Sequence, residues 1–369
     1  MVIGLVRETG PGERRVALTP TAVRRLLDGG HRVFVEHNAG EFSHFHDTAY
    51  AAAGARVVFT PAEVIDRAEL LVKVERPGPA EFDMLHPGQA IMAFFHLATA
   101  TRNTVHALLN RNITTIGLEI IETDDGILPV LVAMSEIAGP MAVAVAAHLL
   151  RSSSGGRGVL LGGAPGIPPA KVVILGAGTV GTWAARTAVN SGASTIIFDN
   201  DPLQLRRLYH AVPGAMGVLS DAEAIGHAVA EADVVIGAVL RRGDRAPHLV
   251  SHAMVESMRP GAVILDLSID QGGCVETSRP TTLADPVYVH KGVLHYCVPN
   301  MTADIAHTAS AVMSQAVLPY IEALAHNGLE EGLARNSALT RGLYTVRGRC
   351  ASLPLAQRWD FEPGGPHKR

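Results

Sequence analysis

A glycine-rich turn between two apolar segments constrains the fold of this chain more than any other feature. The segment from Lys171 to Leu175 is short and rich in Val and Ile, which predicts a buried strand. Gly176, Gly178 and Gly181 follow it with the spacing G-x-G-x-x-G. The first glycine allows a tight turn, the second lets the backbone approach a pyrophosphate, and the third lets a helix pack closely. The turn therefore predicts a dinucleotide-binding βαβ unit.

The residues after the turn supply the rest of this unit. Residues 179–190 predict a helix, whose N-terminal amides and positive dipole end would face the phosphates. Residues 193–198 predict the second strand, and Asp199 follows 18 residues after Gly181. A carboxylate at this place can accept hydrogen bonds from both ribose hydroxyls of an adenosine. Strand, glycines, helix, strand and acid thus occur in the order that a Rossmann unit requires.

The acid also indicates which dinucleotide is bound. Asp199 would repel a 2′-phosphate, and Asn200 and Asp201 offer no guanidinium to accept one. Arg206 and Arg207 lie on the next predicted helix, from which they would have to reach back. The sequence therefore favours NAD over NADP as the cofactor.

Composition restricts the function further. The chain has 369 residues, enough for two domains, and 47% of them are hydrophobic and 18% charged, as in a soluble globular protein. A net charge of −4 argues against a nucleic-acid partner, which requires a basic face. The most apolar stretch, residues 129–150, contains Ser135, Glu136 and Pro140, so no membrane span is expected. Residues 1–6 are too short for the hydrophobic region of a signal peptide.

Cysteine and histidine patterns give no metal site. The three cysteines form no C-x-x-C motif, so a reducing cytoplasm is the expected compartment. His44 and His46, and likewise His248 and His252, have tolerable ligand spacing but no acidic or cysteine companion nearby. We expect these to be surface or packing histidines.

Strand and helix patterns alternate along both halves of the chain, which predicts an α/β fold with parallel sheets. We expect two Rossmann-like, doubly wound domains. The NAD-binding domain, residues 129–307, is inserted into a discontinuous substrate domain of residues 1–128 and 308–369. Two long helices, about 129–150 and 308–325, would bridge the domains beside a cleft for cofactor and substrate. The tail from about residue 347 is expected to be a loose end.

Candidate groups for hydride chemistry stand at predicted strand ends. Arg14 and Arg15, in the loop after the first strand, can grip a carboxylate with two parallel hydrogen bonds. Lys73 is the one charge within residues 70–74, which also suits a lysine that extends its amine to solvent. His96 follows an apolar strand; it is either a proton donor and acceptor or a packed loop histidine.

Two acids belong to the strand of residues 262–268 and its end. Asp270 stands at the tip, followed by Gln271 and two glycines, on the cofactor side of the predicted sheet. Asp266 lies inside the strand and is expected to be a structural hydrogen-bonding group. Asp270 is therefore the candidate of the two for chemistry.

Taken together, several segments resemble those of L-alanine dehydrogenase, a family related to the NAD-binding subunit of proton-translocating transhydrogenase. The resemblance covers about residues 1–345 in order and without large gaps. The segments that carry it are 8–20, 71–74, 95–98, 134–139, 155–166, 236–240, 268–274 and 278–282.

The resemblance implies reversible oxidative deamination, in which L-alanine, NAD and water give pyruvate, ammonium and NADH. Arg15 would clamp the substrate carboxylate, and Lys73 would bind the carboxylate or the carbonyl oxygen. His96 would be the general acid and base. Asp270 would position water or ammonia and stabilise the cationic iminium.

The resemblance also implies a cofactor site and a homohexamer. Beyond Gly176 and Gly181, NAD would contact Ser135, Gly178, Val180, Asp199 and Ser220. Leu240, Ile269, Asp270, Asn300 and Met301 would surround the nicotinamide.

Two positions depart from the family pattern. Thr302 replaces a proline that would stiffen the loop over the site, and Pro140 is expected to kink its helix and shift Ser135. These departures are also compatible with a dehydrogenase that acts on another small amino acid or 2-oxo acid. A non-catalytic NAD(H) sensor is the non-enzyme alternative, and a transhydrogenase subunit would be expected to lack the pair of His96 and Asp270.

Overall fold

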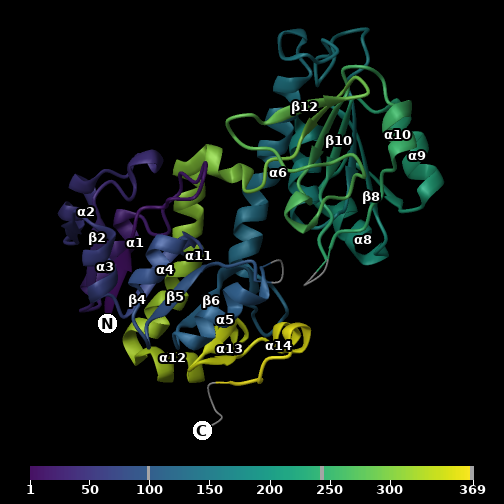
Figure 1. Cartoon of the computed structure of the whole chain (residues 1–369). Coiled ribbons are helices and arrows are strands. Elements are labelled where there is room, and N and C mark those ends of the chain that lie inside the picture. Colours follow the sequence, from purple (N-terminus) through teal and green to yellow (C-terminus); the bar gives the residue numbers. More distant parts are fainter. Residues whose placement is uncertain (98–99, 242–244, 366–369) are drawn as a thin grey trace. The chain divides into compact units, whose positions relative to one another are not determined.

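The chain folds into two compact units, which are described separately. The computed structural model describes residues 1–97, 100–241 and 245–365. Unit 1 comprises Met1–Met134 and Ala303–Arg369, and unit 2 comprises Ser135–Thr302. Both are α/β with largely parallel sheets (Figure 1). This confirms the predicted fold class, including the return of the N-terminal part at the C-terminus.

Unit 1 is built on an eight-stranded sheet in the order β15-β14-β6-β5-β4-β1-β2-β3. Its strands are β1 Val2–Leu5, β2 Arg32–Glu36, β3 Arg56–Val58, β4 Leu70–Glu75, β5 Ala90–Phe94, β6 Thr114–Gly117, β14 Leu343–Val346 and β15 Arg349–Cys350. The strands from β6 to β3 are parallel, whereas β14 runs antiparallel to β6 and β15 antiparallel to β14. The carboxyl ends of β1, β4 and β5 therefore meet at one edge.

The C-terminal segment is not the expected loose end. Residues 343–350 form β14 and β15, and α14 covers Leu353–Trp359. Cys350, Leu355 and Ala356 are buried in the unit 1 core. The prediction was wrong because a segment rich in Arg, Pro and Gly still carries enough apolar side chains to pack.

Helices surround the unit 1 sheet. They are α1 Pro20–Asp28, η1 Glu41–Ser43, α2 Asp47–Ala53, α3 Pro61–Arg67, α4 Pro79–Met84, α5 Arg102–Asn110, η2 Leu118–Ile120, α11 Ala306–Asn327, α12 Leu329–Arg335 and α13 Ser337–Arg341. The helix α1 begins at a capped end, since the Thr19 hydroxyl accepts a hydrogen bond from the backbone of Ala22 and Pro20 occupies the first turn.

Unit 2 contains a seven-stranded sheet in the order β12-β13-β11-β10-β7-β8-β9. Its strands are β7 Lys171–Leu175, β8 Ser194–Asp199, β9 Met216–Leu219, β10 Val234–Gly237, β11 Val263–Asp266, β12 Val287–His290 and β13 Val293–Tyr296. All neighbours are parallel except β12 and β13. The strand order reverses at β7, and the carboxyl end of such a strand is where open α/β sheets bind ligands.

The helices of unit 2 flank this sheet, with α8, α9 and α10 visible beside it in Figure 1. They are η3 Ser152–Ser154, α7 Thr179–Asn190, α8 Pro202–Ala211, α9 Ala222–Glu231, α10 His252–Ser257 and η4 Ile269–Gln271. The predicted strand 171–175 and helix 179–190 agree with β7 and α7 residue for residue.

The boundaries between the units fall inside regular structure. One lies within α6, Pro129–Leu149, and the other within η5, Met301–Ile305. The helix α6 continues through Pro140. Among the described residues it is the one helix long and apolar enough to cross a membrane, although the core helix of a soluble protein passes the same test.

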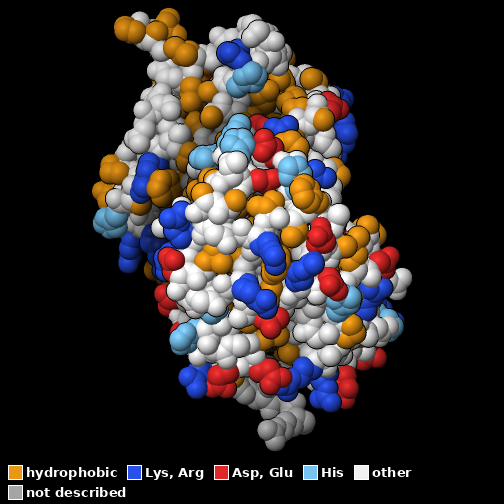
Figure 2. Space-filling view, turned by 90° about the vertical axis from the view of Figure 1, so that its left-hand side faces the viewer, with side chains coloured by type: hydrophobic (Ala, Val, Ile, Leu, Met, Phe, Trp, Pro, Cys, Tyr) orange, Lys and Arg blue, Asp and Glu red, His pale blue; other side chains and the backbone are white. Residues whose placement is uncertain are grey.

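The surface seen in Figure 2 intersperses basic and acidic side chains with apolar ones. Such mixing accords with the modest net charge of the sequence.

Candidate active site

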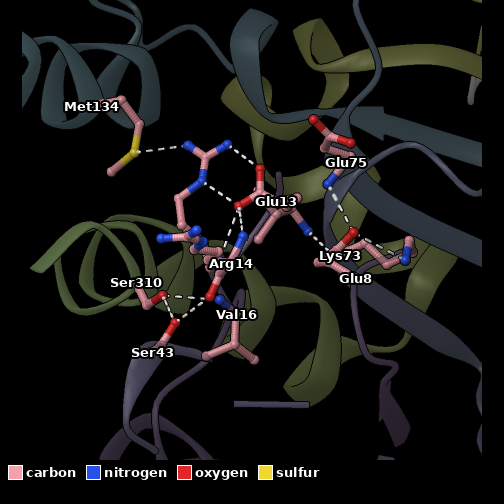
Figure 3. A network of polar contacts seen from close by, with 11 residues as sticks. Glu8, Glu13, Arg14, Val16, Ser43, Lys73, Glu75, Met134 and Ser310 are labelled. Carbon is pink, nitrogen blue, oxygen red and sulfur yellow. Dashed lines mark hydrogen bonds and ion pairs between the residues drawn. The ribbon is translucent and has the colours of Figure 1, made fainter. Parts of the chain in front are cut away.

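Arg15 lies in the loop that follows β1, and its guanidinium is held by a carboxylate two residues earlier. Its Nε donates to Glu13 Oε1 at 2.8 Å and its Nη2 to Glu13 Oε2 at 2.5 Å, and both side chains are buried. Glu13 Oε1 also accepts the backbone amide of Arg15 at 2.9 Å. Nη1 faces the Sδ of Met134 at 4.0 Å (Figure 3). Burial would lower the pKa of Arg15, but Glu13 outweighs it and the net shift is upward. Arg15 is thus a fixed, permanently charged group.

Lys73 is the second buried cation of unit 1. It lies on β4 with only 2% of its surface exposed. Its Nζ donates to Glu81 Oε1 at 2.8 Å and contacts Glu8 Oε2 at 3.2 Å. Burial would lower the pKa of Lys73, but the two carboxylates outweigh it and raise the pKa. The structure therefore contradicts the alternative of a lysine that reaches into solvent.

The sheet topology explains why Glu8 and Lys73 meet. The strand β1 lies beside β4, so the residues just beyond β1 reach the carboxyl end of β4. Glu8 Oε1 accepts the backbone amide of Val74 at 2.7 Å. Glu81 is placed by its own helix, because its Oε2 caps α4 by accepting the amide of Gly78 at 2.8 Å.

Glu8 is the group of this cluster with the most altered acidity. Burial raises the pKa of Glu8 to about 7, although Lys73 and the amide of Val74 act in the opposite direction. Neither Glu8 nor Glu81, the two carboxylate partners of Lys73, was predicted as a site residue.

His96 follows β5, the neighbour of β4, and its ring is exposed. Its backbone adopts a φ of +48°, in the left-handed region that side chains other than glycine rarely occupy. Glu119 holds this conformation by accepting the amides of His96 at 2.6 Å and Phe95 at 3.3 Å. The hydroxyl of Tyr344, on β14, donates to the same carboxylate at 3.0 Å. His96 is therefore a loop histidine with a fixed backbone and an accessible ring.

The glycine turn of unit 2 has the geometry that its spacing predicts. Gly176 has a φ of +101°, and a Cβ there would lie 2.5 Å from the carbonyl oxygen of Ala238. A Cβ on Gly181 would lie 1.8 Å from the carbonyl oxygen of Gly176. A Cβ on Gly178 would meet no heavy atom within 4 Å. The first and third glycines are thus required by the protein itself, whereas the second borders open space at the start of α7.

Asp199 closes this turn from the end of β8. Its Oδ2 accepts the amide of Ala177 at 2.6 Å and its Oδ1 the amide of Asp201 at 2.8 Å. The backbone of Ser220, after β9, donates to the carbonyl oxygen of Asp199 at 2.9 Å. Open space at Gly178, the first turn of α7 with Val180, and this carboxylate together fit the phosphates and ribose of a dinucleotide.

Asp270 stands in η4, exposed, just beyond β11. The buried Asp266 brackets its loop by accepting the amides of Ser268 at 3.1 Å and Cys274 at 2.9 Å. The Ser268 hydroxyl accepts the amide of Val239 at 3.0 Å, which ties the loop to the end of β10. Burial raises the pKa of Asp266, against the effect of its hydrogen bonds. The structure thus gives Asp266 the structural role that the sequence suggested.

The other predicted cofactor residues lie in unit 2 as well. Leu240 is exposed beyond β10, and Ile269 is buried in η4. Ser135 is on α6, while Asn300, with a φ of +52°, precedes the buried Met301. Their contacts with a cofactor remain predictions.

The structure brings Arg15 and Lys73 together at one edge of the unit 1 sheet, and the glycine turn with Asp199 at one edge of the unit 2 sheet. The partners that sequence reasoning missed are Glu8, Glu13, Glu81, Glu119 and Tyr344. Glu8 and Glu13 lie inside a segment that carries the family resemblance, whereas Tyr344 has no local signal. Among the described residues no group of three His, Cys, Asp or Glu side chains is placed to hold a metal.

A Rossmann-like nucleotide-binding unit, joined in one chain to an α/β unit with two buried cations, defines an NAD-dependent oxidoreductase as the class of protein. Residues 4–138 match the family "Alanine dehydrogenase/PNT, N-terminal domain" and residues 142–352 match "Alanine dehydrogenase/PNT, C-terminal domain". The chain belongs to the alanine dehydrogenase/PNT family, and the second of these is the NAD(H)-binding domain of that family.

Known relatives agree over nearly the whole length. The chain is 42% identical over 363 residues to an alanine dehydrogenase of Halomonas elongata, covering 98% of both chains. It is 44% identical over 357 residues to an alanine dehydrogenase of Mycobacterium tuberculosis, covering 96% of both. A solved L-alanine dehydrogenase structure matches with a TM-score of 0.93 at 43% identity, covering 98% of this chain and 99% of that one. A transhydrogenase structure from Sinorhizobium meliloti matches with a TM-score of 0.81 at 26% identity, covering 96% and 99%.

Proposed function

We propose that this enzyme catalyses the NAD-dependent, reversible oxidative deamination of L-alanine to pyruvate and ammonium. The observation that carries the proposal is the pair of buried cations, Arg15 and Lys73, at the carboxyl edge of the unit 1 sheet. Relatives named alanine dehydrogenase, at 42% and 44% identity, support the same substrate. The balanced reaction is L-alanine, NAD⁺ and water giving pyruvate, ammonium, NADH and a proton.

Each candidate residue has a role in this reaction. Arg15 and Lys73 bind the substrate carboxylate and the carbonyl oxygen, because both carry positive charge in a buried site. His96 exchanges a proton with the reacting amine and hydroxyl groups, for which an accessible imidazole is suited. Asp270 stabilises the cationic iminium and positions water or ammonia.

We assign cofactor binding to residues 129–307 and substrate binding to residues 1–128 and 308–369. NAD, when bound, accepts or returns the hydride. The glycine turn would hold its pyrophosphate and Asp199 its adenosine ribose, which favours NAD over NADP. Ser135, Val180, Ser220, Leu240, Ile269, Asn300 and Met301 would complete this site.

Initial rates of NADH oxidation test the proposal. Pyruvate with ammonium should be turned over fastest in a panel with glyoxylate, 2-oxobutyrate and oxaloacetate. Turnover that is fastest with another oxo acid would mean that the enzyme uses a different substrate by the same mechanism. Tight NADH binding without turnover of any acid would contradict the proposal and favour a sensor.

We also propose that the chain works in the reducing cytoplasm, as its cysteine pattern suggests, and that it assembles as a homohexamer, as the family resemblance implies. Sedimentation velocity of the purified protein should give a single species of six chains. A monomer or dimer at working concentration would contradict the assembly.

A further inference from the structure

The site in unit 1 holds more negative than positive charge. Its charged members, here called the Arg15–Lys73 cluster, are Arg15, Lys73, Glu8, Glu13 and Glu81. All five are buried or nearly so, with side-chain exposures of 8% or less. Two cations and three carboxylates would carry a net charge of −1 if all were ionised. An incoming carboxylate would make the net charge −2 in a site of low dielectric.

The surroundings of Glu8 do not offset this excess. Lys73 and the backbone amide of Glu75 face it from β4, and Glu13 acts on it from the loop after β1. Glu81, on α4, shares Lys73 with it. Glu36 on β2, whose pKa burial also raises, interacts electrostatically with Glu81 and Lys73, and Arg7 offsets the charge of Glu36. On the other side of β4 lies β5, which His96 follows. A ligand anion therefore needs an additional positive charge, and a proton can supply it.

Among the three carboxylates, Glu8 is the one whose bonding leaves an oxygen weakly held. Glu13 binds Arg15 through both oxygens, and Glu81 uses one oxygen for Lys73 and the other for its helix cap. Glu8 Oε1 has a short bond of 2.7 Å from Val74. Among the described residues, its Oε2 has only the contacts of 3.2 Å with Lys73 Nζ and 3.5 Å with the amide of Glu75. Oε2 is thus the oxygen most easily protonated.

We propose that Glu8 takes up a proton at Oε2 when a carboxylate ligand binds beside Arg15 and Lys73, so that the substrate acid and H⁺ bind together. The step forms one O–H bond, and the proton comes from solvent. The inference rests on the proposed function only in placing a carboxylate at these two cations. Lys73, relieved of one of its two anionic partners, is then available to the ligand.

The acidity of Glu8 sets the size of the effect. A group with a pKa of about 7 is about half protonated at pH 7 and about nine-tenths ionised at pH 8. Ligand binding that completes protonation would therefore take up about 0.1 proton at pH 6, about 0.5 at pH 7 and up to about 0.9 at pH 8.

Isothermal titration calorimetry measures this uptake directly. Oxamate, an unreactive analogue of pyruvate, is titrated into the whole enzyme with saturating NADH, in phosphate and in Tris buffer. The difference in apparent enthalpy, divided by the difference in buffer ionisation enthalpy, gives the protons bound per site. We expect the uptake to increase from pH 6 to pH 8 in the unaltered enzyme.

Two variants assign the proton. Glu8→Gln should bind oxamate with uptake reduced to a fifth or less of the original at pH 8. His96→Gln removes the imidazole to which the proposed mechanism also assigns a proton, and it should retain the rise toward pH 8. Bound NADH and an unchanged circular dichroism spectrum verify that each variant is folded.

Uptake that is absent at pH 8 in the unaltered enzyme, or unchanged in a folded Glu8→Gln, would overturn the inference. Failure of oxamate to bind would overturn it as well. These results are independent of the proposed function, which the turnover of pyruvate decides separately. Should Glu8→Gln fail to fold, the pH dependence in the unaltered enzyme and in His96→Gln still decides.

Discussion

The candidate sites of unit 1 and unit 2 are formed by different kinds of chemical group. In unit 1, buried charged side chains compensate one another, as Glu13 does for Arg15 and Glu8 and Glu81 do for Lys73. In unit 2, the backbone forms the site through glycines, amide groups and one carboxylate, Asp199. A site made of buried charges depends on pH and on every partner, whereas a site made of backbone depends on shape.

The chemistry of unit 1 should be the most sensitive part of the comparison. We expect His96→Ala to lower kcat by about 10²- to 10⁴-fold, because a positioned acid and base contributes about that much. NADH affinity should change little, since the glycine turn lies in the other unit. Stopped-flow turnover and NADH fluorescence titration measure the two effects. Equal losses in both would mean that His96 is structural.

The next largest effect should be on stability, when one buried cation of unit 1 is removed. Lys73→Met leaves Glu8 and Glu81 buried without their cation, which lowers the free energy of unfolding by about 3–5 kcal/mol at pH 8. Lys171→Met is the matched control, because Lys171 pairs with Glu231 at the surface and its loss should lower the free energy of unfolding far less. Urea denaturation of both variants checks the difference. Similar costs at the two positions would contradict the charge-compensated description of unit 1.

The pH dependence of stability isolates Glu8. The raised pKa means that the folded chain keeps a proton that the unfolded chain releases above its ordinary pKa of 4.5. Stability is therefore lost as pH rises from 4.5 to about 7, by about 3 kcal/mol from this group. Glu8→Gln should lack this loss, so its stability relative to the original chain should increase from pH 5 to pH 8. A stability difference independent of pH would show that Glu8 keeps its ordinary pKa in the folded chain.

A glycine comparison tests the backbone site in unit 2. Gly178→Ala should leave the melting temperature unchanged, because its Cβ meets no protein atom within 4 Å, yet weaken NADH binding by at least about tenfold. Gly181→Ala places its Cβ 1.8 Å from a backbone oxygen and should lower the melting temperature itself. Thermal unfolding and NADH titration separate the two. Equal effects on stability would refute the distinction.

The smallest expected effect concerns the support of His96. Tyr344→Phe removes one hydrogen bond to Glu119 and should cost about 0.5–1.5 kcal/mol of stability. The amides of Phe95 and His96 still hold Glu119, so kcat should fall by no more than about tenfold. Denaturation and initial rates test this. A loss of kcat as large as that of His96→Ala would show that Tyr344 by itself sets the position of the imidazole.

The same contrast explains what the sequence could predict. Spacing alone specified β7, the glycine turn, α7 and Asp199, because each of these depends on neighbours close in sequence. Arg15, Lys73 and His96 were found as candidates from strand ends and from family resemblance. Glu119 and Tyr344 were missed because only the sheet topology brings them close to His96. Glu81 is only eight residues from Lys73, and it was missed because the local sequence does not show that α4 brings it onto the amine. The prediction of a loose end after residue 347 was wrong for a similar reason. The few apolar side chains of this segment stabilise it only by packing against the folded unit, which the local sequence does not show.

The bond between Tyr344 and Glu119 also has a consequence for the order of events during synthesis. The two residues are 225 positions apart, and β14 completes the sheet beside β6. At about 5–20 residues per second a ribosome needs roughly 11–45 s to make the intervening chain. Until then the edge of β6 is unpaired, and unit 2 has emerged in full before unit 1 can close. The first part of the chain to be made is thus the last to be finished.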